Sequence, residues 1–75
     1  MSANESNLVF VTLYKKYNKM MLSKQEVANE LGISIRTLNR RIQEKSALPS
    51  YSKNGGLVLF PLENLAKYIT ALGKL

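Results

Sequence analysis

The chain has 75 residues, a net charge of +6 and an apolar fraction of 45%, the profile of one small, basic globular domain. It contains no cysteine and no histidine, which excludes disulfide scaffolds, thiolate nucleophiles and the commonest metal ligands and general bases. No apolar run is longer than that of residues 57–60, which is far shorter than the roughly 20 residues that span a bilayer. We therefore expect a cytoplasmic binding protein with no enzymatic activity, metal, cofactor or membrane association, and nucleic acid is the first partner to consider.

The N-terminal part divides into a polar segment and an apolar one. Residues 1–6 are small and polar and are expected to be disordered, which leaves one domain over 7–75. Apolar residues from Leu8 onward recur at helical steps and predict a helix over 7–19, although its β-branched residues would suit a strand equally well. Its lysines are expected on a solvated face, and the two methionines that follow, Met20 and Met21, are expected to fill the core.

The next two elements read as a pair of short helices joined by a tight turn. Ser23 and Glu26 have the spacing of a capping box, in which each residue satisfies a free backbone amide of the other at a helix start. Gly32 is expected to end this helix in the left-handed conformation, and Ser34 to cap a second helix that runs to about Lys45. The connection of three or four residues is too short for comfortable antiparallel packing, so the helices must cross steeply.

Small and apolar residues occupy the positions that such a crossing requires. Ala28 allows close approach of the second helix, and Leu38 is expected to pack into the angle. The apolar residues expected beneath it are Val27, Leu31 and Ile33. This pattern predicts a helix-turn-helix, although any tight helical hairpin shares much of it.

A hairpin and a last helix are predicted after Pro49. Asn54-Gly55-Gly56 separates two strand-like runs, and Asn-Gly is the strongest short hairpin signal because both residues tolerate positive φ. Pro61 suits the first position of a closing helix, which Gly73 ends. The predicted fold class is therefore mostly α with a small β-hairpin wing, a winged helix-turn-helix.

The second helix of the pair carries much of the charge. Segment 34–45 holds four cationic residues and one carboxylate, a net charge of +3 out of the chain's +6. At about 100° per residue, Arg36, Arg40 and Gln43 lie opposite the apolar stripe. Arginine can bond bidentately to guanine in the major groove, which admits an α-helix. The alternative is a solvated basic face with no ligand.

Taken together, residues 22–69 resemble the small winged helix-turn-helix domains of phage excisionases and MerR-like regulators. The segments that carry the resemblance are 22–28, 31–34, 37–42, 48–49 and 60–69. It implies that the second helix enters the major groove and that the hairpin contacts the backbone or minor groove. The DNA-binding residues expected from it and from the exposed helix face are Ser34, Arg36, Thr37, Asn39, Arg40 and Gln43 on the helix and Tyr51, Lys53 and Asn54 on the wing. The chain departs from the family in having a single basic residue near the wing tip and no Ser or Asp cap on the last helix.

The expected function is sequence-specific binding of double-stranded DNA. Two roles stay open, an excisionase-type recombination directionality factor and a small transcriptional regulator of a phage or mobile element. In either role we expect a recombinase or RNA polymerase as a further partner and a homo-oligomer on DNA. The alternative is a protein-interaction module that uses the same fold to dock on a partner protein, through the exposed apolar residues of helix 7–19. Glu26 and Glu30 lie one turn apart, but Glu26 is explained as a cap partner, so no catalytic residue is expected.

Overall fold

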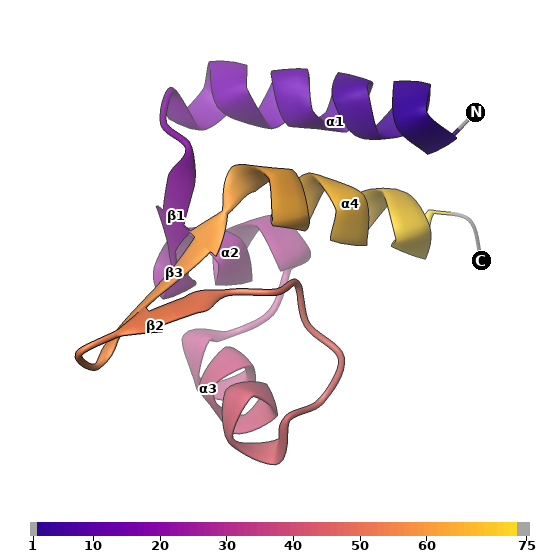
Figure 1. The fold of residues 1–75 in the computed structure, drawn as a ribbon. Coiled ribbons are helices and arrows are strands. Elements are labelled where there is room, and N and C mark those ends of the chain that lie inside the picture. The colour runs from indigo at the N-terminus through magenta and orange to yellow at the C-terminus, as the bar shows by residue number, and fades with distance from the viewer. Residues whose placement is uncertain (1, 74–75) are drawn as a thin grey trace.

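The structure is a computed structural model that describes the backbone of residues 2–73 and the side chains of residues 7–73. Four helices surround a three-stranded antiparallel sheet with strand order β1-β3-β2 (Figure 1). The elements in chain order are α1 (Ser2–Tyr17), β1 (Met21–Ser23), α2 (Lys24–Leu31), α3 (Ile35–Glu44), β2 (Ser52–Asn54), β3 (Leu57–Pro61) and α4 (Leu62–Leu72). The predicted fold class, a mostly helical winged helix-turn-helix, is confirmed.

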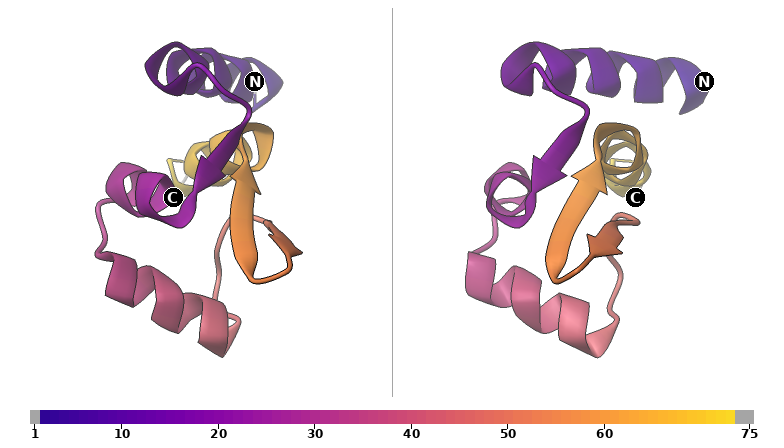
Figure 2. Two further views of the ribbon diagram at one scale, coloured as in Figure 1. Left: turned by 90° about the vertical axis from the view of Figure 1, so that its left-hand side faces the viewer. Right: turned by 60° about the vertical axis from the view of Figure 1, so that its left-hand side comes forward.

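The layers place α3 at one end of the molecule. Helix α1 packs along α4 at the opposite end, and the sheet and α2 lie between them and α3 (Figures 1 and 2). The turn of the β2–β3 hairpin also lies toward the α3 end (Figure 2). Within the part of the chain described, no helix is both long and apolar enough to cross a membrane.

The core is formed by every element except β2. Its fully buried side chains include Leu22 of β1, Phe60 of β3 and Leu38 of α3. The remaining buried hydrophobic residues are Leu13, Val27, Ala28, Val58, Leu62, Leu65 and Ala66. Leu38 is the one buried residue of α3, and Ile35 and Ile42 pack beside it against the core, so α3 is anchored along one side and exposes the opposite side.

Helix α1 differs from the predicted helix at both ends. Its backbone is helical from Ser2, so it includes most of the segment expected to be disordered, while Met1 lies outside the described residues. The helix ends at Tyr17 rather than at residue 19, because Asn18 adopts a positive φ of 55° that a helix cannot continue.

The β1 strand was not predicted, and the expectation that Met20 and Met21 fill the core is wrong. Both side chains are exposed, at 51% and 36%. The next residue, Leu22, is the one that is buried. Leu22 pairs with Phe60 of β3, and the Met20 carbonyl accepts a hydrogen bond of 2.7 Å from the Leu62 amide. This bond satisfies one of the free amides at the start of α4, which has Pro61 at its N-cap and no side-chain cap. Pro61 therefore lies one position earlier than predicted.

Lysines and a tyrosine of the N-terminal segment fasten α1 to α2. Lys16 Nζ and Tyr17 Oη both donate to Glu30 Oε2 at 2.5 Å, and Lys19 Nζ lies 2.8 Å from Glu26 Oε2. Burial, aided by the hydrogen bond to Glu30, raises the pKa of Tyr17 to about 12. Burial alone would raise the pKa of Glu30, but the hydrogen bonds from Lys16 and Tyr17 hold it below its ordinary value of 4.5. Lys16 and Lys19 are solvated as the sequence predicts, with 60% and 51% of their side chains exposed, and they also form ion pairs with α2.

We expect this contact to make the domain acid-sensitive. The pKa of Glu26 is lowered by the hydrogen bonds from Lys19 and from the Ser23 amide, and that of Glu30 is lowered as well. A carboxyl group whose pKa is lowered by folding stabilises the fold at pH values above its unfolded pKa of about 4.5. That stabilisation is lost as the pH falls through the pKa of the folded state. The melting temperature should therefore fall below about pH 4.5. Glu30→Gln should lower the melting temperature at pH 7 by several degrees, which corresponds to about 1 kcal/mol of stability. The melting temperature of this variant should also depend less on pH below about pH 4.5.

Glu63→Gln provides the matched control, because the Glu63–Lys67 pair of α4 is exposed on both sides. Thermal unfolding followed by circular dichroism between pH 3 and pH 7 measures both variants. Equal melting curves for Glu30→Gln and the native chain at every pH would contradict the proposed role of Glu30.

Candidate nucleic-acid interface

The turn between α2 and α3 has the geometry that the sequence predicts. Ser23 Oγ accepts from the Glu26 amide at 3.2 Å while Glu26 Oε1 accepts from the Ser23 amide at 2.9 Å, which completes the capping box. Gly32 ends α2 in the left-handed conformation with φ of 72°, a value that favours glycine. The Ile33 amide then bonds back to the Ala28 carbonyl at 3.0 Å. With Ala28 and Leu38 both fully buried at the crossing, α3 is held in a fixed position on α2.

Ser34 begins α3 and uses its hydroxyl to do so. Its Oγ accepts from the Thr37 amide at 3.0 Å and lies 3.0 Å from Thr37 Oγ1, to which it donates. The first turn of α3 contains no acidic residue, so the positive end of the helix dipole is not neutralised there. Ser34 therefore shapes the start of the helix, and its remaining capacity to bond a ligand is small.

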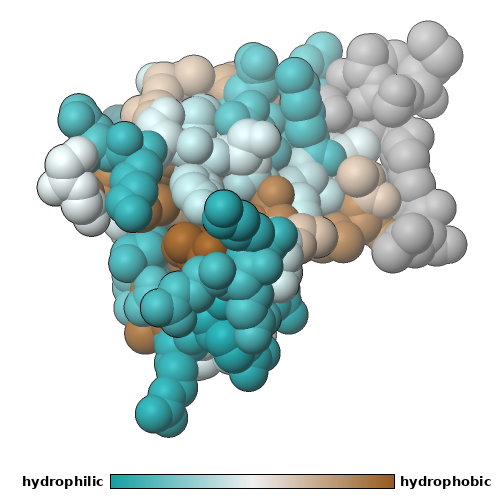
Figure 3. All heavy atoms as spheres, turned by 60° about the horizontal axis from the view of Figure 1, so that its bottom comes forward, coloured by the Kyte–Doolittle hydropathy of each residue, from teal (hydrophilic) through white to brown (hydrophobic). Residues whose placement is uncertain are grey.

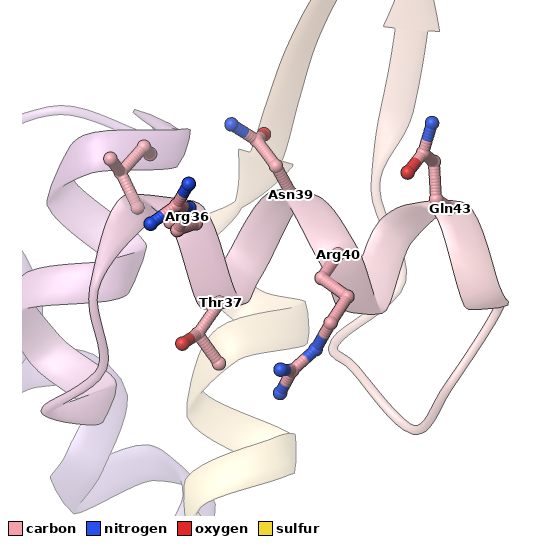
Figure 4. A pocket seen from close by; sticks show the side chains of 6 residues that line it. Arg36, Thr37, Asn39, Arg40 and Gln43 are labelled. Atoms are coloured by element: carbon pink, nitrogen blue, oxygen red, sulfur yellow. The ribbon is translucent and has the colours of Figure 1, made fainter.

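The outward face of α3 gathers the polar residues that the sequence singled out. Asn39 and Gln43 point to one side of the helix and Thr37 and Arg40 to the other, with Arg36 between them (Figure 4). They line an open hollow of about 580 Å³ together with Ile35. Because all lining residues belong to one helix, the hollow does not enclose a small molecule. The side chains around it instead form an open, polar helix face of the kind that fits a groove.

This face carries positive charge that other residues of the described chain do not neutralise. The ion pairs of residues 7–73 join Glu26, Glu30 and Glu63 to lysines of α1, α4 and the α1–β1 turn. None of them includes Arg36 or Arg40, both of which are exposed. Viewed from the α3 end, the surface is largely hydrophilic with a few apolar patches (Figure 3). The face is therefore available to an anionic partner.

The wing residues divide between the two sides of the hairpin. The two-residue turn is Gly55-Gly56, with φ of 58° and 90°, so Asn54 is the last residue of β2 rather than part of the turn. Lys53 pairs with the buried Val58, whereas Asn54 pairs with the exposed Leu57 on the opposite face.

Tyr51 lies just before β2 and packs edge-on against Phe60, with ring centroids 5.3 Å apart. About a third of it stays exposed. Its ring thus contributes to packing while its surface remains accessible, and all three predicted wing residues are exposed.

Lys24 is a polar residue of this surface that the sequence analysis missed. It is the first residue of α2, and its Nζ donates to Asn39 Oδ1 across the helix pair at 2.9 Å. No periodicity marks such a contact, because it depends on how the two helices cross. The helix face and Lys24 together form what we call the recognition surface, which consists of Lys24, Arg36, Thr37, Asn39, Arg40 and Gln43.

Residues 23–44 match the family model of the helix-turn-helix of bacterial regulatory proteins of the Fis family. The segment is a DNA-binding helix-turn-helix. The match begins at the N-cap of α2 and ends at the last residue of α3, so it covers the two helices and the turn between them and less than a third of the chain. No curated protein and no solved structure matches the chain significantly. The matching regulators are of the Fis family, so the resemblance to excisionases and MerR-like regulators stays a prediction.

Proposed function

We propose that the chain binds double-stranded DNA sequence-specifically, with α3 in the major groove and the β2–β3 hairpin as a wing beside it. The observation that carries this proposal is the exposed, unneutralised basic face of a helix held rigidly by a DNA-binding helix-turn-helix. B-DNA presents a groove about 12 Å wide, which accepts such a helix. The α3 end of the molecule, from which both α3 and the hairpin turn project, is the side that would face the duplex (Figure 2).

The proposed contacts follow from the position of each side chain. Arg36 and Arg40 read guanine edges, and Asn39 and Gln43 contact bases on one flank of the helix. Thr37 contacts a phosphate at the helix start, and Ser34, whose hydroxyl proton goes to Thr37, lies beside that contact. On the wing, Lys53 contacts phosphate, and Tyr51 and Asn54 lie close to the backbone or minor groove.

Two roles fit this binding mode, an excisionase-type recombination directionality factor and a small transcriptional regulator of a phage or mobile element. Selection from a random duplex pool at roughly physiological salt, followed by sequencing, distinguishes them. Tandem sites about one helical turn apart would support the directionality factor, which lines up along DNA and contacts a recombinase. Inverted repeats would support a dimeric regulator that acts through RNA polymerase. Failure to enrich any sequence would contradict the proposal.

A protein-interaction module is the second candidate, because α1 exposes apolar side chains. Leu8 is 70% exposed, Val11 46% and Tyr14 41%. On this alternative the basic helix has no ligand, and substitution of its arginines leaves partner binding unchanged. Substitution of Leu8 and Val11 with Ser would then abolish it.

We expect Lys53→Ala to weaken binding to all duplex sequences by a similar factor. A lysine on phosphate releases about one counterion, so the slope of log K against log salt should become shallower by about 0.9. Lys67→Ala on α4 removes the same charge from a site paired with Glu63 and should leave the slope unchanged. Fluorescence anisotropy titrations at four salt concentrations measure both. A change confined to one base position would contradict a phosphate contact for Lys53.

A further inference from the structure

The hydrogen bond between Lys24 and Asn39 fixes which end of the Asn39 amide is free. Lys24 Nζ donates to Asn39 Oδ1 at 2.9 Å. An ammonium group has donors and no acceptor, so the atom that it contacts must be the carbonyl oxygen of the amide. The Nδ2 group, with its two hydrogen atoms, is therefore the end of Asn39 that has no partner among the side chains of residues 7–73. Asn39 lies on the flank of α3 beside Arg36 (Figure 4).

We propose that Lys24 sets the base preference of the recognition surface by holding Asn39 as a hydrogen-bond donor. Lys24 is thus a positioning residue, and Asn39 selects guanine over adenine at the base pair that it contacts. This inference rests on the proposed function, the entry of α3 into the major groove.

The chemistry of the two purines explains the preference. A free asparagine recognises adenine bidentately, with Nδ2 donating to N7 and Oδ1 accepting from the N6 amino group. Here an adenine amino group that approached Oδ1 would meet the Lys24 ammonium, whose positive charge repels the partially positive amino hydrogens. Guanine offers N7 and O6, two acceptors, to the free Nδ2 group.

The neighbouring arginines act in the same direction. Arg36 and Arg40 carry donors only, and their forks match the N7 and O6 acceptors of guanine. Arg36, Arg40 and the free end of Asn39 thus present donors to the groove, while Gln43 and Thr37 retain acceptors. The substrate class that follows is a duplex site with a guanine-rich strand facing α3.

Three variants test the role of Lys24 in the random duplex selection. Asn39→Ala first identifies the base pair that Asn39 contacts, because the selected sites should lose their base preference at that position. At that pair the native chain should favour guanine over adenine. Lys24→Met keeps the length of the side chain but removes the donor, and should move the guanine-to-adenine ratio at least about fivefold toward adenine. Lys24→Arg retains a donor and should keep the native ratio.

Lys53→Met is the matched control, since it removes one positive charge from the same side of the molecule and should lower affinity without changing any base ratio. A second readout needs no DNA. In the free protein, the nuclear magnetic resonance signals of the Asn39 side-chain amide should shift in Lys24→Met and stay in place in Lys53→Met.

The inference is overturned if Lys24→Met keeps the native base ratio, or if its effect persists in an Asn39→Ala background. It is also overturned if the signals of the Asn39 side-chain amide do not shift in Lys24→Met. If the native chain enriches no sequence, the proposed function fails first, and the inference fails with it. A native chain that enriches sites with adenine at the Asn39 position retains the proposed function and contradicts only the role of Lys24.

Discussion

Leu38→Ala should destabilise the domain by about 2–5 kcal/mol, a large part of the stability of a chain of this size. Leu38 is fully buried where α3 crosses α2, and it is the single buried residue of α3. Its truncation leaves a cavity that the crossing cannot close, because Gly32 and the two caps fix the helices in place. Urea unfolding monitored by circular dichroism measures the change in the free energy of unfolding.

Leu8→Ala is the control for this experiment. Leu8 is 70% exposed on α1, so the same chemical truncation should change the free energy of unfolding by less than about 0.5 kcal/mol. If the two variants unfolded at the same urea concentration, Leu38 would not anchor α3, and the helix-turn-helix geometry would be wrong with it.

The double variant Arg36→Ala, Arg40→Ala should lose at least about a hundredfold in affinity for the selected duplex while keeping its melting temperature. Each bidentate arginine contact contributes about 1–3 kcal/mol to recognition of its base. Both side chains are exposed, and neither takes part in an ion pair within residues 7–73. Their removal therefore breaks none of the ion pairs that stabilise the fold. Anisotropy titration and thermal unfolding of the same preparation separate binding from folding.

Lys15→Ala, Lys67→Ala removes two positive charges from α1 and α4, away from α3, and serves as the matched control. Because neither lysine lies on the side proposed to face the duplex, this variant should leave the affinity and its salt dependence nearly unchanged. If the arginine variant bound the duplex as tightly as this control, α3 would not be the recognition helix, and the protein-interaction alternative would gain support.

The helix-turn-helix could be predicted from the sequence because its signals are local. The capping box of Ser23 and Glu26 acts across three residues, and the left-handed Gly32 and the Ser34 cap act on adjacent amides. The burial of Ala28 and Leu38 follows from helical periodicity alone. The exposed positions of Arg36 and Arg40 follow from the same periodicity, so the candidate site was accessible to sequence reasoning, and its contacts with DNA stay a prediction.

The features that were missed depend on segments distant in the chain. The β1 strand is three residues long and lacks β-branched residues, and it exists because Leu22 pairs with Phe60. The Lys24–Asn39 hydrogen bond depends in the same way on the crossing of two helices. The hairpin turn was misplaced by one residue because Asn-Gly and Gly-Gly are both good turn sequences and the pairing of the strands decides between them.

The pairing of β1 with β3 has a consequence for cooperativity. Leu22 precedes α2 and Phe60 follows the hairpin, so the whole of the helix-turn-helix and the wing lie inside a loop whose two ends are hydrogen-bonded to each other. The entropic cost of closing that loop is incurred once, and the closure holds both the helix-turn-helix and the wing in place. Opening the strand pair would therefore release α2, α3 and the hairpin together. The amides that join β1 to β3 should exchange with solvent only on global unfolding, and a peptide confined to the two helices would lack the constraint that orients them.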